Sequence, residues 1–190
     1  MGKNIKWPVV AVAALAASAQ TAQAADGGEF RISPFLGLAG TEVDGRYQEF
    51  GQTFEYDGYT VGISAAYRAP FGLVAEIGTS ASGDPYFGWA TGGELREVYA
   101  AVGYDFDVAG NWRITPKLGW TSWELQAGEI EDLVDDRGDE TESIDGEDPF
   151  VELAIARRFG QHIAIGLALR ATDVEFGKSR SAAFTLSWTF

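Results

Sequence analysis

Apolar residues alternate with polar or small residues through most of the chain, and this period-two pattern constrains the fold more than any other feature. It is clearest at the end of the chain, where every second residue is apolar: Ala182, Phe184, Leu186, Trp188 and Phe190. Because successive side chains of a strand point to opposite faces, the pattern predicts strands with one apolar face each. Seven further strands are predicted around residues 30–38, 59–68, 71–78, 98–106, 112–120, 151–159 and 163–169.

Proline occurs within two of the predicted strands, at Pro34 and Pro116. Proline has no N–H to donate to a strand ladder. Each of these two residues therefore predicts a bulge or a local kink.

The connections between the predicted strands alternate in length. Short turns are predicted near residues 69–70, 107–110 and 160–161, whereas long, Gly-rich or acidic segments occupy residues 44–54, 81–92 and 124–148. Outer-membrane barrels have an even number of strands, short periplasmic turns and long extracellular loops. We therefore predict an all-β fold: an eight-stranded antiparallel up-and-down transmembrane β-barrel with four loops, three turns and both termini in the periplasm.

The alternation alone does not say which face points outward, because a soluble lipocalin-like barrel has the same pattern with an apolar interior. The opposite parity carries a few charges among many small residues, which suits a narrow polar lumen. On the apolar parity only Arg157 is charged, and it lies near a predicted periplasmic turn, where its stem can snorkel. Aromatic residues near the short turns predict an interfacial girdle: Tyr67, Phe71, Tyr104, Phe106, Trp112, Phe159, Trp188 and Phe190.

The N-terminal residues have the composition of an export signal. Lys3 and Lys6 precede an apolar, Ala-rich stretch at 7–17, and small residues surround a cleavage point after Ala24. An N-terminal membrane anchor is the alternative, although the apolar stretch is shorter than the roughly 20 residues of a span. We predict a signal peptide at residues 1–24 and the barrel domain at residues 25–190.

The charge balance and the lack of cysteine exclude several classes of protein. The 190 residues carry 28 acidic and 14 basic side chains, for a formal net charge of −14, so binding to nucleic acid is not expected. With no cysteine, neither disulfides nor a cysteine-ligated metal can stabilise the fold, whereas a closed hydrogen-bonded barrel can. Beyond the N-terminal stretch, no apolar run is long enough for a helical span.

The chain resembles the small eight-stranded outer-membrane barrels: the OmpA transmembrane domain, OmpX and Ail, OmpW and the opacity-type surface antigens. The resemblance lies in the alternating end of the chain at 182–190, in the segment 102–106 and in the export signal. It implies a location in the cell outer membrane, in contact with lipid and lipopolysaccharide. It also implies that the barrel-assembly machinery recognises the apolar side chains of the last strand, Phe184, Leu186, Trp188 and Phe190.

Charged residues on the parity opposite the apolar face form a candidate lumen network. Its members are Glu76, Glu152, Arg113, Lys117 and Arg170, with Arg68 and Glu97 nearer the rims. The interior of an eight-stranded barrel is just wide enough for side chains, so these charges must pair or be hydrated. One interpretation is a structural polar core. The other resembles what is proposed for OmpA: a gate in which alternative ion pairs open a narrow path for ions or small solutes.

The segment at 124–148 holds 12 carboxylates and one arginine. Such a charge density does not pack, which predicts an acidic extracellular loop. Within it, Asp135, Asp136, Asp139 and Glu140 are candidates for weak Ca²⁺ or Mg²⁺ binding, although their spacing does not match a calcium loop. A solvated, repulsive loop without a ligand is the alternative.

Three aromatic residues, Tyr86, Phe87 and Trp89, fall in the second predicted loop. Exposed aromatic side chains often anchor interfaces, so they are candidates for contact with a host or surface ligand. The alternative is a cap on the barrel or contact with the lipid headgroup layer.

The sequence offers little for catalysis. Its only histidine, His162, falls in a predicted periplasmic turn, and neither Gln161 nor Ile163 beside it is a nucleophile. Acyl transfer would need a base paired with a nucleophile and an orienting carboxylate. We therefore predict a monomeric, non-enzymatic surface protein without a cofactor, whose role is structural and mediated by its loops. The alternative function is the narrow gated channel.

Overall fold

In the computed structural model the chain forms strands joined by turns, and the residues described are 27–43, 55–83, 94–126, 143–174 and 177–190. The strands are β1 (Glu29–Val43), β2 (Glu55–Arg68), β3 (Leu73–Gly83), β4 (Glu94–Tyr104), β5 (Phe106–Val108), β6 (Trp112–Gln126), β7 (Ser143–Phe159), β8 (Ile163–Val174) and β9 (Gly177–Thr189). Within these ranges no helix is long and apolar enough to cross a membrane.

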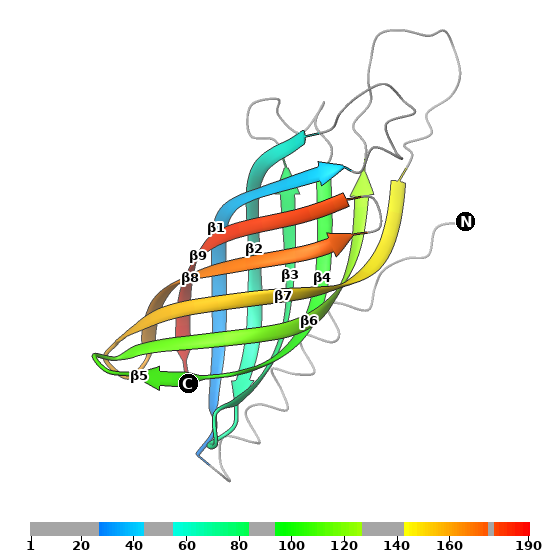
Figure 1. The fold of residues 1–190 in the computed structure, drawn as a ribbon. Helices are drawn as coiled ribbons and strands as arrows, with labels where there is room; N and C mark the ends of the chain where they lie inside the picture. The colour runs from blue at the N-terminus through cyan, green and yellow to red at the C-terminus, as the bar shows by residue number, and fades with distance from the viewer. Residues whose placement is uncertain (1–26, 44–54, 84–93, 127–142, 175–176) are drawn as a thin grey trace, which may run out of the picture.

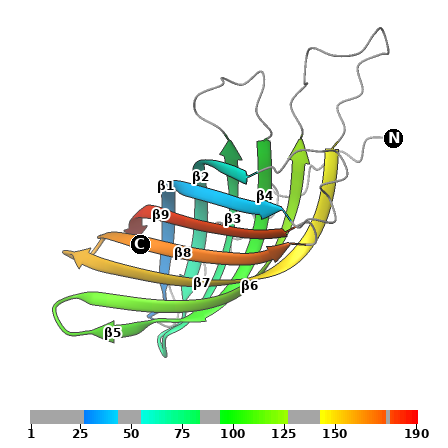
Figure 2. The ribbon, with the colours of Figure 1, turned by 45° about the horizontal axis from the view of Figure 1, so that its top comes forward.

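The strands close into a barrel of eight (Figures 1 and 2). Each pairs antiparallel with the next, and β1 pairs with β9 to complete the circle. β4 and β5 count as one barrel strand because both pair with β6 and are separated only by Asp105. The predicted eight-stranded antiparallel barrel is confirmed.

Neither proline produces a bulge, so that part of the expectation was wrong. The register between β1 and β2 is continuous through Pro34, and the register between β6 and β7 is continuous through Pro116. On its other side each proline faces a short gap in the ladder, and the register is the same before and after that gap. The missing N–H therefore removes pairing on one side without shifting the strand.

The apolar parity forms the outer face of the barrel. Large apolar side chains on it are exposed, from 37% for Val98 to 70% for Phe184. Side chains of the other parity fill the interior, where Thr60, Ser64 and Ser80 are buried. An apolar exterior around a polar interior is the arrangement that a lipid surround requires, so the predicted orientation of the two faces is borne out.

Glycines opposite aromatic residues let the interior pack. Four inward aromatic rings each lie against a glycine that is their register partner on the neighbouring strand, where a Cβ would collide with the ring. The pairs are Phe35 with Gly62, Tyr99 with Gly78, Phe150 with Gly119 and Trp123 with Gly146. An aromatic ring laid flat over a glycine covers the exposed backbone and fills the lumen without widening the barrel.

The two rims differ in their connections. Short turns at residues 69–72, 109–111 and 160–162 join the strands at one rim, here called the turn rim. The C-terminus lies there too, because the N–H of Thr189 donates to the carbonyl of His162. Connections of 44–54, 84–93 and 127–142 join the strands at the opposite rim, whereas the fourth connection, predicted as a loop, is only 175–176.

Candidate functional site

The centre of the lumen holds a ladder of alternating charge on three neighbouring strands. Lys117 of β6 is the register partner of Glu152 on β7, which is in turn the partner of Arg170 on β8. The Nζ of Lys117 lies 2.7 Å from Oε1 of Glu152, and Nη2 of Arg170 lies 2.7 Å from Oε2 of the same carboxylate. Opposite charges on directly paired residues stabilise a sheet, and here they also satisfy one another in the interior.

Lys117 also reaches past β4 to β3. Its Nζ lies 2.7 Å from Oε2 of Glu76, whose Oε1 accepts a hydrogen bond from the Tyr99 hydroxyl at 3.3 Å. The lysine stem lies over Gly103, its register partner on β4, where a side chain would block it. We call Glu76, Lys117, Glu152 and Arg170 the central ladder; its two cations balance two carboxylates.

Aromatic rings complete the environment of Arg170. Its guanidinium carbon lies 3.9 Å from the ring centroid of Tyr99 and 4.3 Å from that of Phe150. The guanidinium therefore has a carboxylate at its edge and π systems beside it, a combination that stabilises a desolvated cation.

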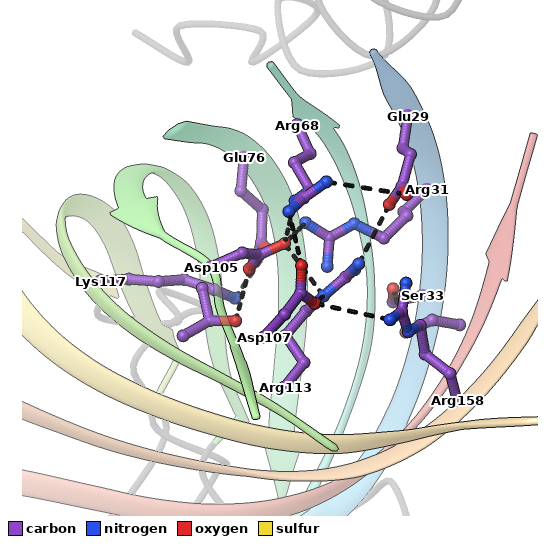
Figure 3. A network of polar contacts seen from close by, with 12 residues as sticks. Glu29, Arg31, Ser33, Arg68, Glu76, Asp105, Asp107, Arg113, Lys117 and Arg158 are labelled. Atoms are coloured by element: carbon purple, nitrogen blue, oxygen red, sulfur yellow. Dashed lines mark hydrogen bonds and ion pairs between the residues drawn. The ribbon is translucent and has the colours of Figure 1, made fainter. Parts of the chain in front are cut away.

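A second polar cluster lies nearer the turn rim and is centred on one carboxylate, Asp105 (Figure 3). The Asp105 side chain is 0% exposed. Nitrogen atoms of Arg31, Arg68 and Arg113 lie 2.9, 3.1 and 3.3 Å from its Oδ2, and Thr115 donates a 2.6 Å hydrogen bond to its Oδ1. Asp105 thus ties β1, β2 and β6 to the junction between β4 and β5.

Two further carboxylates surround this centre. Oε2 of Glu29 lies 3.2 Å from Nη2 of Arg113. Oδ2 of Asp107 lies 2.9 Å from Nη2 of Arg68, and its Oδ1 lies 3.7 Å from Nη2 of Arg158 on β7 (Figure 3). Asp107 is 42% exposed at the rim, whereas Asp105 is enclosed. We call this set the turn-side cluster: Glu29, Arg31, Arg68, Asp105, Asp107, Arg113, Thr115 and Arg158.

The single network predicted from sequence is therefore two. Glu76, Glu152, Lys117 and Arg170 are brought together as expected, but Arg113 belongs to the turn-side cluster and pairs with Glu29, Asp105 and Asp107 instead. The Arg113 and Lys117 positions share a parity yet stand four residues apart on β6, so they reach different levels of the lumen. Glu97 accepts a 2.7 Å hydrogen bond from Ser80.

Sequence reasoning missed Glu29, Asp105 and Asp107 as partners in this cluster, and it did not treat Arg31 as a site residue. The signal was available for Asp105, because it shares the inward parity of Glu97 and Tyr99 along the same barrel strand. A systematic count of charges by parity finds it, although the count does not say which arginines converge there.

Side chains fill the described part of the lumen. Residues of both clusters line a cavity of about 70 Å³, which is room for about two water molecules. Toward the opposite rim, Trp123 and Leu95 are buried, and the Trp123 indole donates a 2.7 Å hydrogen bond to Asp148. A filled lumen does not favour the channel alternative.

The loop candidates lie outside the described residues. Tyr86, Phe87 and Trp89 fall in 84–93, and Asp135, Asp136, Asp139 and Glu140 fall in 127–142. The predicted acidic loop is shorter than expected, because β6 continues to Gln126 and β7 begins at Ser143. Cross-strand pairing and the Trp123–Asp148 hydrogen bond hold the ends of that segment in the sheet despite its charge. Among the described residues no cluster of three or more His, Asp or Glu could hold a metal ion.

The last strand forms the seam of the barrel. Phe184, Leu186, Trp188 and Phe190 point outward and are exposed. Phe190 exchanges two backbone hydrogen bonds with Phe30 of β1, and their rings lie 6.4 Å apart. His162 lies in the turn between β7 and β8, as predicted, and its Nδ1 donates a 2.9 Å hydrogen bond to the Thr189 carbonyl.

A closed eight-stranded barrel with an apolar exterior and a charged, filled lumen defines the class of small transmembrane barrels. The chain matches the family model of the outer membrane protein beta-barrel domain over residues 9–190, and it belongs to that family. Membership implies the outer membrane as its location.

Solved structures share this fold. The Neisserial surface protein A (NspA) superimposes with a TM-score of 0.67 at 14% identity, over 87% of this chain and 100% of that chain. Ail, the attachment invasion locus protein of Yersinia pestis, was solved in complex with the heparin analogue sucrose octasulfate. It superimposes with a TM-score of 0.62 at 11% identity, over 86% of this chain and 99% of that chain. The N-terminal β-barrel domain of Pseudomonas aeruginosa OprF superimposes with a TM-score of 0.51 at 13% identity, over 83% of this chain and 97% of that chain. No curated protein matches the chain.

Proposed function

We propose that the protein is a non-enzymatic surface barrel, which anchors its extracellular connections in the outer membrane and acts through them. The observation that carries the proposal is the filled lumen. Two ion-pair clusters occupy the interior of the described barrel and line a cavity of about 70 Å³. We therefore assign the barrel the role of a rigid support and place interaction at the rim with the long connections.

The lengths of β6 and β7 support this assignment. A tilted strand needs about 9–11 residues to cross a bilayer, whereas β6 has 15 and β7 has 17. Their excess length lies away from the turn rim and carries Glu124, Asp145 and Glu147 on the outward parity. Charges on that face belong in water, so we place the ends of β6 and β7 away from the turn rim beyond the hydrocarbon layer.

The charge of the chain narrows the choice of partner. Ail was solved with a heparin analogue, but a sulfated polyanion would be repelled by a chain of net charge −14 with 12 carboxylates in residues 124–148. We propose instead a basic or neutral surface ligand, contacted by the acidic connection and by Tyr86, Phe87 and Trp89.

Replacement of residues 127–142 by a short Gly-Ser turn tests the assignment. Bacteria that display the intact protein should attach to host cells more than vector controls, and the replacement should abolish the difference while heated and unheated samples still differ in electrophoretic mobility. A matched variant, D135N/D136N/D139N/E140Q, keeps the loop length and should lower attachment. Equal attachment by all variants would contradict the proposal.

The remaining expectations stay proposals of the same kind. Weak Ca²⁺ or Mg²⁺ binding at Asp135, Asp136, Asp139 and Glu140 predicts a heat of binding in calorimetry that the matched variant lacks. We also propose contact with lipopolysaccharide, recognition of β9 by the barrel-assembly machinery and a monomeric state. His162→Ala should leave attachment unchanged.

A further inference from the structure

Arg157 stands apart from the other cations near the turn rim. It lies on β7, two residues before the strand ends at Phe159, and its side chain is on the outward parity and exposed. The next residue, Arg158, points to the lumen side and pairs with Asp107 at 3.7 Å (Figure 3). Arg157 and Arg158 are neighbours in sequence, but they lie on opposite faces of the barrel wall.

Aromatic rings flank the Arg157 guanidinium. Its carbon lies 5.5 Å from the ring centroid of Phe159 and 5.9 Å from that of Trp112, its register partner on β6. On β8 its register partner is the apolar, exposed Ile165. The rings hold the guanidinium at the level of the aromatic girdle, which marks the headgroup layer of a bilayer.

No carboxylate of the described residues pairs with Arg157. This distinguishes it from the lumen arginines at positions 31, 68, 113 and 170, which all have carboxylate partners. The other charged side chains described on the outward parity lie toward the opposite ends of their strands: Arg96, Glu124, Asp145, Glu147, Asp173, Lys178 and Arg180. At its depth, Arg157 is the outward charge that has no carboxylate partner among the described residues.

A guanidinium at a lipid boundary is costly unless an anion meets it. The anion available at the headgroup level is the phosphodiester of a glycerophospholipid, and the planar fork of arginine matches two phosphate oxygens. We propose that Arg157, flanked by Trp112 and Phe159, binds the phosphate of a phospholipid in the membrane leaflet at the turn rim. The acyl chains then lie along the apolar face beside Ile165.

The experiment measures binding of dioleoylphosphatidylglycerol to the folded, delipidated full barrel in detergent by native mass spectrometry. The wild type should bind one lipid with saturation, and Arg157→Gln should bind it at least fivefold more weakly. Arg158→Gln is the matched control, since it removes an equal charge one residue away on the other face, and it should bind as the wild type does. Dioleoylglycerol, which lacks the phosphate, and glycerophosphoglycerol, which lacks the chains, should both bind at least fivefold more weakly to the wild type.

The proposal is overturned if Arg157→Gln binds as tightly as the wild type, if Arg158→Gln loses as much affinity, or if dioleoylglycerol binds equally well. Equal binding of glycerophosphoglycerol would show an anion site that does not need a lipid, and it overturns the assignment as well. Heat-dependent electrophoretic mobility confirms that each variant is folded before the comparison.

Discussion

The central ladder and the turn-side cluster solve the same problem, burial of charge in a narrow barrel, in different ways. In the ladder, cations and carboxylates alternate along register partners on β6, β7 and β8, and Tyr99 and Phe150 pack beside Arg170. In the turn-side cluster, three arginines converge on Asp105 from β1, β2 and β6. None of these arginines is a register partner of Asp105.

The contrast shows how burial of charge can be shared or concentrated. Each charged group of the ladder has an alternative: Lys117 has two carboxylates, and Arg170 has two rings as well as Glu152. The three arginines around Asp105 share one enclosed carboxylate. Among the described residues Arg31 pairs with Asp105 alone, whereas Arg68 and Arg113 also pair with the partly exposed Glu29 and Asp107. Loss of that one group should therefore cost more than loss of any group in the ladder.

Asp105→Asn should have the largest effect. It removes the enclosed carboxylate that three guanidinium groups share and leaves the largely buried Arg31 without a carboxylate partner among the described residues. Breaking a buried ion pair in this way typically costs about 3–5 kcal/mol in the free energy of unfolding. Reversible urea unfolding in phospholipid vesicles measures this change. A loss below about 1 kcal/mol would show that the arginines do not depend on Asp105.

Glu152→Gln should have a smaller effect, about 2–3 kcal/mol, because charge-assisted hydrogen bonds are lost while Lys117 keeps Glu76 and Arg170 keeps its rings. A double-mutant cycle sharpens the comparison. Glu152→Gln should couple to Arg170→Met by about 1–2 kcal/mol, whereas Asp105→Asn should add to Arg170→Met within about 0.5 kcal/mol. Strong coupling between Asp105 and Arg170 would mean that the lumen is one network after all.

Gly78→Ala should destabilise the central region by about 1–3 kcal/mol, because the new Cβ meets the Tyr99 ring and overpacks the lumen. The same substitution in a Tyr99→Leu background should cost less, since the ring is gone. Urea unfolding of the four chains of this cycle gives the comparison. An equal cost in both backgrounds would rule out the ring as the cause.

Asp107→Asn should have the smallest effect, below about 1 kcal/mol, because the carboxylate is 42% exposed and water screens its ion pairs. It is the matched control for Asp105→Asn, since the two residues lie on the same barrel strand and share arginine partners. Equal losses for the two variants would remove the distinction between an enclosed centre and an exposed rim.

The fold follows from the sequence because period-two patterns survive in every barrel strand, even where residues such as Pro34 interrupt the hydrogen bonds. The parity of Phe184 and Trp188 correctly predicts an outward face. Strand ends near the acidic segment were not predictable from composition, since the carboxylates of residues 145–148 argue for a loop. Register pairing of β6 with β7 and the Trp123–Asp148 hydrogen bond decide in favour of strand there.

The candidate site was predictable only in part. Parity identified Glu76, Lys117, Glu152 and Arg170 as inward charges, but parity does not give the level at which a side chain meets its partner. Parity alone therefore groups Arg113 with them. Arg31 and Arg68 reach Asp105 from β1 and β2, which pair with neither β4 nor β5, so their convergence becomes visible only when the barrel is closed.

Single-channel recording in planar lipid bilayers tests the filled lumen most directly. Folded protein, verified by its heat-dependent mobility, should give the same baseline current as protein-free lipid at both polarities. Discrete current steps from the wild type that change in size or frequency with Glu76→Gln would contradict the account, because they would show that the central ladder opens.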